Sequence, residues 1–288
     1  MKVLVAGADG QLGRCLQEEL KLRKIEFLPF SRSTLDVTNL SQVRKTVKDK
    51  GITILINASA YTNVEEAENE RNLAFEVNEI GPQNLAIAAR ENDLKFVHFS
   101  TDYVFSGLRK TPWETNALVS PISVYGQSKL AGEIAVFNEH PDNSLVLRTA
   151  WLYSKYGKNF YKTILGLANR SIDPINVVND QIGQPTNALE LARFVVSTLY
   201  SDIPAGTYHA SNTGSATWYD FALYIFQLAG ADTSRIQPIS TITYNYKAPR
   251  PEYSVLDNSM WRKLGVEPLG PWRESVAKAF PAIQESLS

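Results

Sequence analysis

The chain has 288 residues, and its 29 Lys plus Arg nearly balance its 30 Asp plus Glu, which excludes a global charge that would favour nucleic acid or anionic membranes. Its one cysteine, Cys15, cannot form an internal disulfide, and no apolar run approaches the roughly 18 residues of a membrane span. Because an apolar strand begins at residue 2, we expect no signal peptide and a cytoplasmic protein with no nucleic-acid or membrane partner.

Strands and helices are predicted to alternate along most of the chain. A further helix ends at Gly230, after which prolines interrupt the pattern. This alternation predicts an α/β fold with a doubly wound parallel sheet. The expected strands span residues 2–6, 25–30, 52–58, 95–101, 144–150, 175–179 and 206–211. The expected helices lie near residues 11–24, 39–50, 69–77, 82–92, 125–138, 159–170 and 186–200.

Three glycines, Gly7, Gly10 and Gly13, stand between the first strand and the first helix. In a dinucleotide-binding turn the first glycine permits the tight turn, the second lets a pyrophosphate approach the backbone, and the third lets helix and strand pack closely. The helix N-terminus adds amide donors and a positive dipole. The GxxGxxG spacing departs from GxGxxG, and a glycine turn can be only a turn, but its place straight after the first strand favours a cofactor site.

These elements predict a Rossmann-like fold with two parts. Residues 1–150, with parts of 175–215, are expected to form the cofactor-binding domain. Residues 151–174 and 216–288 are expected to form mainly a smaller C-terminal lobe that binds substrate. In such sheets ligands bind beyond the C-terminal strand ends, where this sequence places small and polar residues.

Tyr125 and Lys129 stand four residues apart in a predicted helix, so they share one face. A nearby ammonium group would lower the tyrosine pKa, which is ordinarily about 10, by up to roughly 3. The phenol would then be a usable general acid or base. Such a pair is often only amphipathic surface, but Ser100 and Thr101 at the end of an apolar strand and the glycine turn favour a proton-transfer site.

Eight stretches carry a family resemblance over nearly the whole chain: GADGQLG, LDVTN, INASAYTNVEEAE, STDYVFSG, YGQSKLAGE, LRTAWLY, NDQIGQPT and RPEYSVLDN. The chain resembles the dTDP-4-dehydrorhamnose reductase family of the extended short-chain dehydrogenase/reductase superfamily. The resemblance implies reduction of the C4 ketone of dTDP-4-dehydro-β-L-rhamnose by NADPH to dTDP-L-rhamnose, with Tyr125 as proton donor. The product would be a donor for bacterial polysaccharide synthesis.

The resemblance also implies the residues of the site. The catalytic residues would be Thr101, Tyr125 and Lys129. The cofactor would contact Gly7, Gly10, Gln11, Leu12, Arg32, Asp36, Val37, Ala58, Ala60, Tyr61, Tyr125 and Lys129. The dTDP-sugar would contact Val64, Thr101, Asp102, Trp151, Gln181, Arg250 and Ser254, with Trp151 offering a ring face and Arg250 a charged fork for the diphosphate. Asp102 is alternatively structural, and Trp151 a core residue.

The end of the second expected strand bears on cofactor choice. Ser31, Arg32 and Ser33 stand where an acidic residue would select NAD, so we expect NADPH, with NADH also accepted. The alternative is that Arg32 points to solvent.

Some family members form dimers around a magnesium ion held by carboxylates. Here the corresponding position is Cys15, a poor ligand for a hard cation. Glu18, Glu19 and Glu190 remain nearby possibilities. We expect no structural magnesium, and a monomer or weak homodimer.

Two other functions stay open. The first is a nucleotide-sugar epimerase or dehydratase of the same superfamily, which would retain NAD. The second is a non-catalytic NADP-binding regulatory subunit, against which the Tyr125, Lys129 and Thr101 set argues. His98, His140 and His209 lack metal-ligand spacing and are assigned no chemistry.

Overall fold

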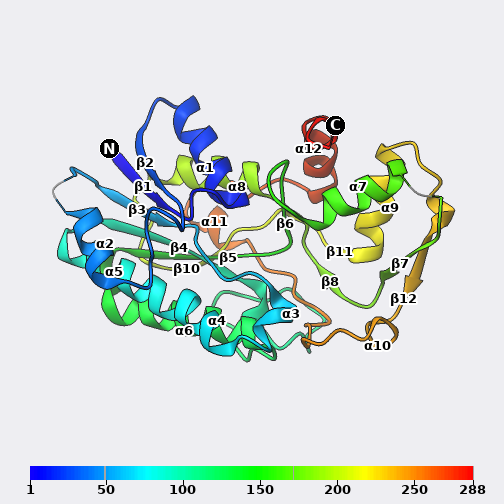
Figure 1. Cartoon of the computed structure of the whole chain (residues 1–288), viewed down its shortest axis with the longest axis horizontal. Helices are drawn as coiled ribbons and strands as arrows, with labels where there is room; N and C mark the ends of the chain where they lie inside the picture. Colours follow the sequence, from blue (N-terminus) through cyan, green and yellow to red (C-terminus); the bar gives the residue numbers. More distant parts are fainter. Residues whose placement is uncertain (49, 171, 288) are drawn as a thin grey trace.

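The computed structural model describes residues 1–48, 50–170 and 172–287. Residues 49, 171 and 288, which belong to the expected helix at 39–50 and the expected smaller lobe, lie outside the described residues. The centre of the molecule is a six-stranded, wholly parallel sheet in the order β10-β5-β4-β3-β1-β2 (Figure 1). Its strands are β1 (Lys2–Ala6), β2 (Glu26–Phe30), β3 (Ile54–Asn57), β4 (Lys95–Thr101), β5 (Ser144–Thr149) and β10 (Gly206–His209).

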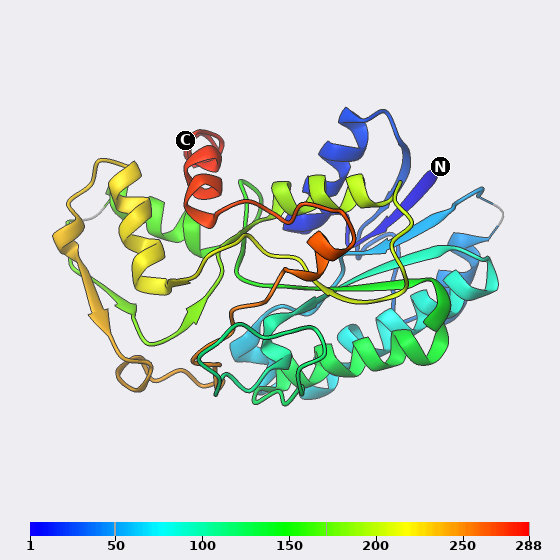
Figure 2. The ribbon, with the colours of Figure 1, turned by 180° about the vertical axis from the view of Figure 1, so that it is seen from behind.

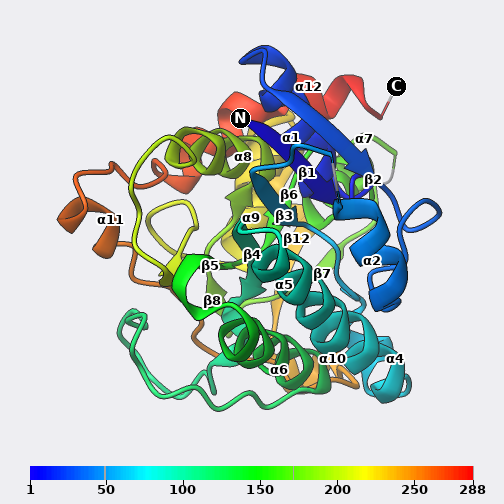
Figure 3. The ribbon, with the colours of Figure 1, turned by 90° about the vertical axis from the view of Figure 1, so that its left-hand side faces the viewer.

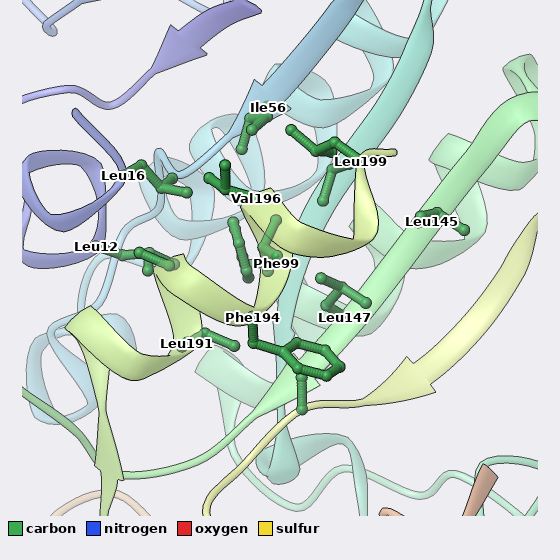
Figure 4. Packing of buried hydrophobic residues seen from close by; sticks show 14 of the residues in the cluster. Leu12, Leu16, Ile56, Phe99, Leu145, Leu147, Leu191, Phe194, Val196 and Leu199 are labelled. Atoms are coloured by element: carbon green, nitrogen blue, oxygen red, sulfur yellow. The ribbon is translucent and has the colours of Figure 1, made fainter. Parts of the chain in front are cut away.

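Helices cover both faces of this sheet, which confirms the doubly wound fold (Figure 3). One face packs against α1 (Gln11–Leu22) and α8 (Ala188–Thr198), whose leucines interlock with Phe99 and Leu147 (Figure 4). The other face packs against α2 (Leu40–Val47), α5 (Gly81–Glu91) and α6 (Val124–Glu139). With both faces buried, the strands read as apolar runs.

Pro29 is accommodated in β2 because this strand lies at the edge of the sheet. A proline cannot donate a ladder hydrogen bond, and an edge strand has one side where none is needed. The helix predicted at 186–200 begins at Ala188, because the Asn187 side chain caps it by accepting a hydrogen bond from the Leu189 amide.

The smaller lobe has its own core, built from α7 (Phe160–Arg170), α9 (Trp218–Leu228) and α12 (Trp272–Glu285). The predicted strand at 175–179 forms as β7 (Ile175–Val178), but it pairs with β12 (Ile236–Ile239) in this lobe. It does not extend the six-stranded sheet, because the sheet edge next to β5 is taken by β10. The other short pairs are β8 (Ile182–Gly183) with β11 (Ala216–Thr217), and β6 (Leu152–Tyr153) with β9 (Thr186–Asn187).

The last third of the chain passes between the two parts of the molecule (Figure 2). Trp261 of α11 (Met260–Lys263) packs in the core beside β10 and α8 of the larger part, before α12 returns to the smaller lobe. The remaining short elements are α3 (Val64–Ala67), α4 (Arg71–Phe75), the π-helical turn η1 (Glu76–Ile80), α10 (Thr241–Tyr244), and the 3-10 turns η2 (Asp102–Val104), η3 (Pro141–Asn143) and η4 (Thr233–Arg235). Within the described ranges, none of the helices is long and apolar enough to span a membrane.

Candidate active site

The glycine turn after β1 brings backbone against backbone. Gly7 has φ +80°, and a Cβ added there would lie 2.4 Å from the Ser59 amide nitrogen. A Cβ at Gly13 would lie 2.2 Å from the Gly7 carbonyl oxygen, so only glycine lets α1 pack this closely on the turn. Gly10 precedes α1 and supplies no side-chain cap. The first amides of α1 are therefore left for a ligand.

A cavity of about 690 Å³ opens beside this turn, at the C-terminal ends of β1, β2 and β3. It is large enough for a substantial part of a dinucleotide. The predicted cofactor residues that line it are Gly7, Gly10, Arg32, Asp36, Val37, Ala58, Ala60 and Tyr61. The cavity is also lined by residues that were not predicted from the sequence: Asp9, Leu35, Thr38, Ser59, Thr62, Asn63, Glu66, Glu70, Leu73, Glu76 and Val77.

Gln11 and Leu12 do not line this cavity. The Gln11 side-chain oxygen accepts hydrogen bonds from Ser154 at 3.2 Å and Asn159 at 2.8 Å. The Leu12 side chain is buried in the core. These two residues can therefore meet a cofactor mainly through the backbone at the start of α1.

Two buried asparagines hold the loop after β3 in place, and neither was predicted. The Asn57 side-chain oxygen accepts from the Ser59 amide at 3.0 Å, while its nitrogen meets His98 Nδ1 at 3.0 Å. Asn78 makes a reciprocal pair with the Tyr61 backbone at 2.8 and 3.0 Å, and it also donates to Ser128 on α6. Single asparagines have no sequence signature for this role, because their partners are distant in the chain.

Arg32 is exposed at the rim of the cavity and has no hydrogen bond or ion pair within the described part of the chain. The nearby Asp36 carboxylate accepts from the Thr38 amide at 3.0 Å and the Thr38 hydroxyl at 2.7 Å. The cation is therefore free to meet an anionic group, whereas the carboxylate is engaged in a local turn.

Helix α6 brings Tyr125 and Lys129 to the end of β4. Ser123 caps the helix by accepting from the Gly126 amide at 3.2 Å. A Cβ at Gly126 would lie 2.3 Å from the Tyr103 carbonyl oxygen, so this glycine permits the close approach of α6 to η2. The rings of Tyr125 and Tyr103 then meet edge to face at 5.5 Å.

The expected lowering of the Tyr125 pKa is wrong for this structure. Part of the Tyr125 residue remains accessible, but burial of its hydroxyl raises the pKa well above the ordinary value, and a hydrogen bond with Thr101 offsets this only in part. Lys129 does not contribute to the shift. Sharing a helix face with Tyr125 was not enough for Lys129 to lower the tyrosine pKa, because the lysine ammonium group has a different partner.

That partner is the backbone of β4. Lys129 is fully buried, and its Nζ donates to the Phe99 carbonyl oxygen at 2.6 Å. Burial lowers the pKa of Lys129 to about 8, with Glu133 acting in the opposite direction. The amine therefore lies at the strand end where nicotinamide cofactors bind in such sheets.

Thr101 and Asp102 begin the loop after β4. The Thr101 hydroxyl accepts from the Tyr103 amide at 3.2 Å and meets the Asp102 carboxylate at 3.1 Å. Asp102 is 2% exposed, and burial raises its pKa to about 6 although the Ser254 and Thr101 hydroxyls act against the shift. The structure thus brings the predicted residues Thr101, Asp102, Tyr125 and Ser254 together.

Arg250 reaches this group from the late part of the chain. Its Nη2 lies 2.7 Å from Glu65 of α3, its Nη1 donates to the Tyr103 hydroxyl at 3.2 Å, and its guanidinium lies 3.9 Å above the Tyr246 ring. Val64, predicted to contact substrate, begins the same helix α3. Glu65, Tyr103 and Tyr246 were not predicted, since only the tertiary fold brings them to Arg250.

Trp151 lies on the smaller-lobe side of the site. Its ring stacks on Trp218, with the ring centroids 3.6 Å apart and an interplanar angle of 7°. Trp218 therefore covers one of the two faces that the Trp151 ring could offer to a ligand. The backbone φ of Trp151 is +43°, a strained value for a bulky residue, and strain of this kind is concentrated at functional sites. Gln181 accepts from Trp218 Nε1 at 3.2 Å and donates to Thr241 at 2.9 Å.

The residues considered for a metal lie apart from this site. Cys15 is 1% exposed in the core, and burial raises its pKa to about 12, so it cannot act as a metal-binding thiolate at neutral pH. Glu18 pairs with Lys155, Glu19 with Arg23, and Glu190 accepts from Asn212. Among the described residues no group of three or more acidic, histidine or cysteine side chains is arranged to hold a metal. The absence of a structural magnesium ion stays a prediction.

The chain is similar over nearly its whole length to a known protein family and to solved structures. Residues 1–285 match the family model of the RmlD substrate binding domain. The chain is 41% identical over 284 residues to dTDP-4-dehydrorhamnose reductase of Streptomyces griseus, covering 97% of this chain and 93% of that protein. It is 38% identical over 285 residues to dTDP-4-keto-6-deoxy-D-glucose reductase of Streptomyces niveus, covering 99% and 98%. The crystal structure of Bacillus anthracis dTDP-4-dehydrorhamnose reductase with NADP superposes with a TM-score of 0.93 at 40% identity, covering 97% of this chain and 98% of that one.

Proposed function

The chain belongs to the RmlD substrate binding domain family of NAD(P)H-dependent oxidoreductases, and we propose that it reduces the C4 ketone of dTDP-4-dehydro-β-L-rhamnose with NADPH to give dTDP-L-rhamnose. The observation that carries this proposal is the contact between Tyr125 and Thr101 at the C-terminal end of β4. The glycine turn and its cavity lie at the C-terminal ends of strands of the same sheet. A carbonyl reduction needs both a cofactor site and a proton donor, and these strand ends offer residues for each.

The residues present fit a phosphorylated dinucleotide. A Cβ would fill the cradle at Gly7, and the first amides of α1 have no side-chain cap. Arg32 lies exposed at the rim of the cavity and has no ion pair with any residue that the structure describes. The NADP complex of the Bacillus anthracis relative supports NADPH, and we expect NADH to be accepted more weakly. When bound, this cofactor supplies the hydride. Lys129 would hold the cofactor ribose hydroxyls beside the end of β4.

Tyr125 would donate the proton to the carbonyl oxygen, and Thr101 would hydrogen-bond the same oxygen. Burial suits this role, because a raised pKa keeps the phenol protonated at neutral pH, and a reduction consumes a proton. Lys129, with its pKa lowered to about 8, would favour the phenolate that remains after transfer if it draws closer in the reacting complex.

The sugar nucleotide would lie between the two parts of the molecule. Arg250 would meet the diphosphate through its charged fork, and Asp102 and Ser254 would bind sugar hydroxyls beside Tyr125. Trp151, backed by Trp218, would bound the sugar on the smaller-lobe side, with Gln181 holding Trp218 in place and Val64 bounding the opposite side. This arrangement would leave the reacting carbonyl within reach of the tyrosine.

A second candidate substrate is the 4-keto-6-deoxy-D-glucose nucleotide. The Streptomyces niveus relative named for that sugar is nearly as similar to this chain as the relative named for dehydrorhamnose. The two substrates share the dTDP group and the C4 ketone, so the residues proposed for the diphosphate and the proton would serve both. Parallel assays with the two sugars decide between them.

The test is a coupled assay that follows NADPH absorbance while the 4-keto sugar nucleotide is made in situ. We expect one NADPH to be consumed per ketone reduced. A dTDP-sugar epimerase or dehydratase would instead retain its cofactor through each turnover, and a regulatory subunit would consume none. Tyr125→Phe should lose roughly 10²- to 10⁴-fold in turnover with NADPH affinity nearly unchanged. Tyr224→Phe, which removes a hydroxyl in the smaller lobe, is the control, and substantial activity in Tyr125→Phe would refute the assignment of the acid.

A further inference from the structure

An unbroken series of side-chain contacts runs from Tyr125 to the molecular surface. Tyr125 meets the edge of Tyr103 at 5.5 Å, and the Tyr103 hydroxyl accepts from Arg250 at 3.2 Å. The Arg250 guanidinium lies 3.9 Å above the ring of Tyr246, which in turn stacks on Tyr244 at 4.1 Å and 25°. The series ends at the surface, because Tyr244 is 51% exposed.

The two outer rings stack because of a local backbone turn. Tyr244 ends helix α10, and Asn245 follows it with φ +58° and ψ +53°. This left-handed conformation is one that asparagine tolerates better than most residues, and it reverses the chain direction. Tyr246 is thereby folded back over Tyr244. The stacking of the two rings therefore follows from the backbone conformation at Asn245.

The segment that carries these rings is anchored at both ends, and it lies between β12 and α3 (Figure 1). On the smaller-lobe side, Thr241 donates its amide at 2.9 Å and its hydroxyl at 2.5 Å to Asp180. On the larger side, the Lys247 and Ala248 amides donate to the Glu65 carboxylate at 2.9 and 3.4 Å. A ligand that bound the rings would therefore meet a preformed surface.

We propose that Tyr244, supported by Tyr246, is the stacking platform for the pyrimidine base of the nucleotide sugar. This inference rests on the proposed function, which places the sugar at Tyr125 and the diphosphate at Arg250. A sugar nucleotide is a linear molecule in the order sugar, diphosphate, nucleoside, so the base must lie beyond Arg250 on the side away from Tyr125. In the series of contacts, Tyr125 and Tyr103 come before Arg250, and the rings of Tyr246 and Tyr244 come after it.

Of the two rings, that of Tyr244 is the more accessible to a ligand. Tyr246 is covered by Arg250 and by Tyr244, whereas Tyr244 is an exposed residue. Stacking of a base on an aromatic side chain is worth enough that its loss weakens binding by roughly fivefold to a hundredfold. It also tolerates any flat base, so this platform would add affinity for the nucleoside without selecting thymine strictly.

The experiment measures binding of dTDP and of inorganic pyrophosphate to the NADP-loaded protein by calorimetry and by competition. Tyr244→Ala should weaken dTDP by roughly fivefold to a hundredfold and leave pyrophosphate within about twofold. Tyr244→Phe, which keeps the ring, should bind both as the wild type does. Tyr200→Ala removes another exposed tyrosine, far along the chain, and should change neither affinity.

Two results would overturn the platform. The first is an unchanged dTDP affinity in Tyr244→Ala, and the second is an equal loss for dTDP and pyrophosphate, which would mean that the ring only supports Arg250. Tyr246→Ala should weaken both ligands, because Tyr246 also contacts the guanidinium. If wild-type protein fails to bind dTDP at all, the proposed function fails, whereas wild-type binding with an unaffected Tyr244→Ala refutes this inference alone.

Discussion

The Nζ atom of Lys129 lies 2.6 Å from the carbonyl oxygen of Phe99, and this hydrogen bond joins helix α6 to the end of strand β4. The amine is fully buried, and its pKa is lowered to about 8 by that burial. The residue thus has a structural partner at the same strand end where the cofactor and the carbonyl are proposed to meet.

Lys129→Met should abolish most turnover and weaken NADPH by roughly tenfold to a hundredfold, since a hydrogen bond from a charged group is worth about 1.5 to 3 kcal/mol. Fluorescence titration with NADPH and steady-state rates measure the two effects. Lys95→Met is the control, because Lys95 lies on β4, the strand that carries the carbonyl partner of Lys129, and its own Nζ meets the Ser201 carbonyl oxygen at 3.4 Å. Loss of turnover with full NADPH affinity would rule out the ribose contact.

Asp102→Asn should stabilise the protein at neutral pH while raising the Michaelis constant for the sugar nucleotide. The folded pKa of Asp102, about 6, lies above the ordinary 3.8, so ionisation is penalised in the fold, and the penalty grows from pH 3.8 to 6 and is fully present above 6. The difference between the two pKa values corresponds to a loss of about 3 kcal/mol in unfolding free energy when Asp102 is ionised. Asparagine carries no charge, so the variant does not suffer this loss. Urea unfolding at several pH values should show the gain at pH 7.5 and none near pH 3.5. A pH-independent gain would mean that Asp102 does not titrate as described.

Arg32→Ala should weaken NADPH roughly tenfold to a hundredfold and leave NADH almost unchanged, because only NADPH carries the 2′-phosphate that this cation is proposed to meet. Titration with both cofactors measures the difference. Lys45→Ala removes the same charge from an exposed position on the neighbouring helix α2 and should affect the two cofactors equally. Equal losses in Arg32→Ala would show that Arg32 does not select the cofactor.

Arg250→Ala should raise the Michaelis constant for the sugar nucleotide and weaken competition by dTDP about tenfold to a hundredfold. Arg250→Lys should recover only part of the loss, since lysine cannot reproduce the fork that meets Glu65 and Tyr103 or the stacking on Tyr246. Arg235→Ala removes another arginine stacked on a ring, that of Phe226, away from the site, and serves as the control. Identical dTDP competition in wild type and Arg250→Ala would place the diphosphate elsewhere.

Gly183→Ala should lower turnover and destabilise the protein by about 1 to 3 kcal/mol. A Cβ at this position would lie 2.5 Å from Cε2 of Trp151, so the ring would have to move from its stack on Trp218. Gly166→Ala is the control, because a Cβ there meets nothing within 4 Å and alanine is favoured in a helix interior, so its stability should be unchanged or higher. Tryptophan fluorescence and thermal unfolding report the two effects, and wild-type behaviour of Gly183→Ala would show that Trp151 is not held by this contact.

The sequence by itself determined the features that depend on local spacing. Strand and helix periods predicted the doubly wound sheet, the glycines after β1 predicted a turn too tight for a Cβ, and the four-residue interval predicted that Tyr125 and Lys129 share a face. Each of these follows from backbone geometry within a few residues, and such geometry does not need the rest of the chain.

The tertiary structure alone decided what each of these groups contacts. Lys129 donates to a strand carbonyl and does not lower the Tyr125 pKa, because burial and partner choice depend on elements far away in sequence. Arg250 meets Glu65 across 185 residues, and Trp151, which lies between β5 and β6, stacks on Trp218 at the start of α9. The strand predicted at 175–179 joined the smaller lobe, since β10 occupied the open edge beside β5. Pairing partners, desolvation and sheet edges are properties of the packed chain, and residue spacing cannot specify them.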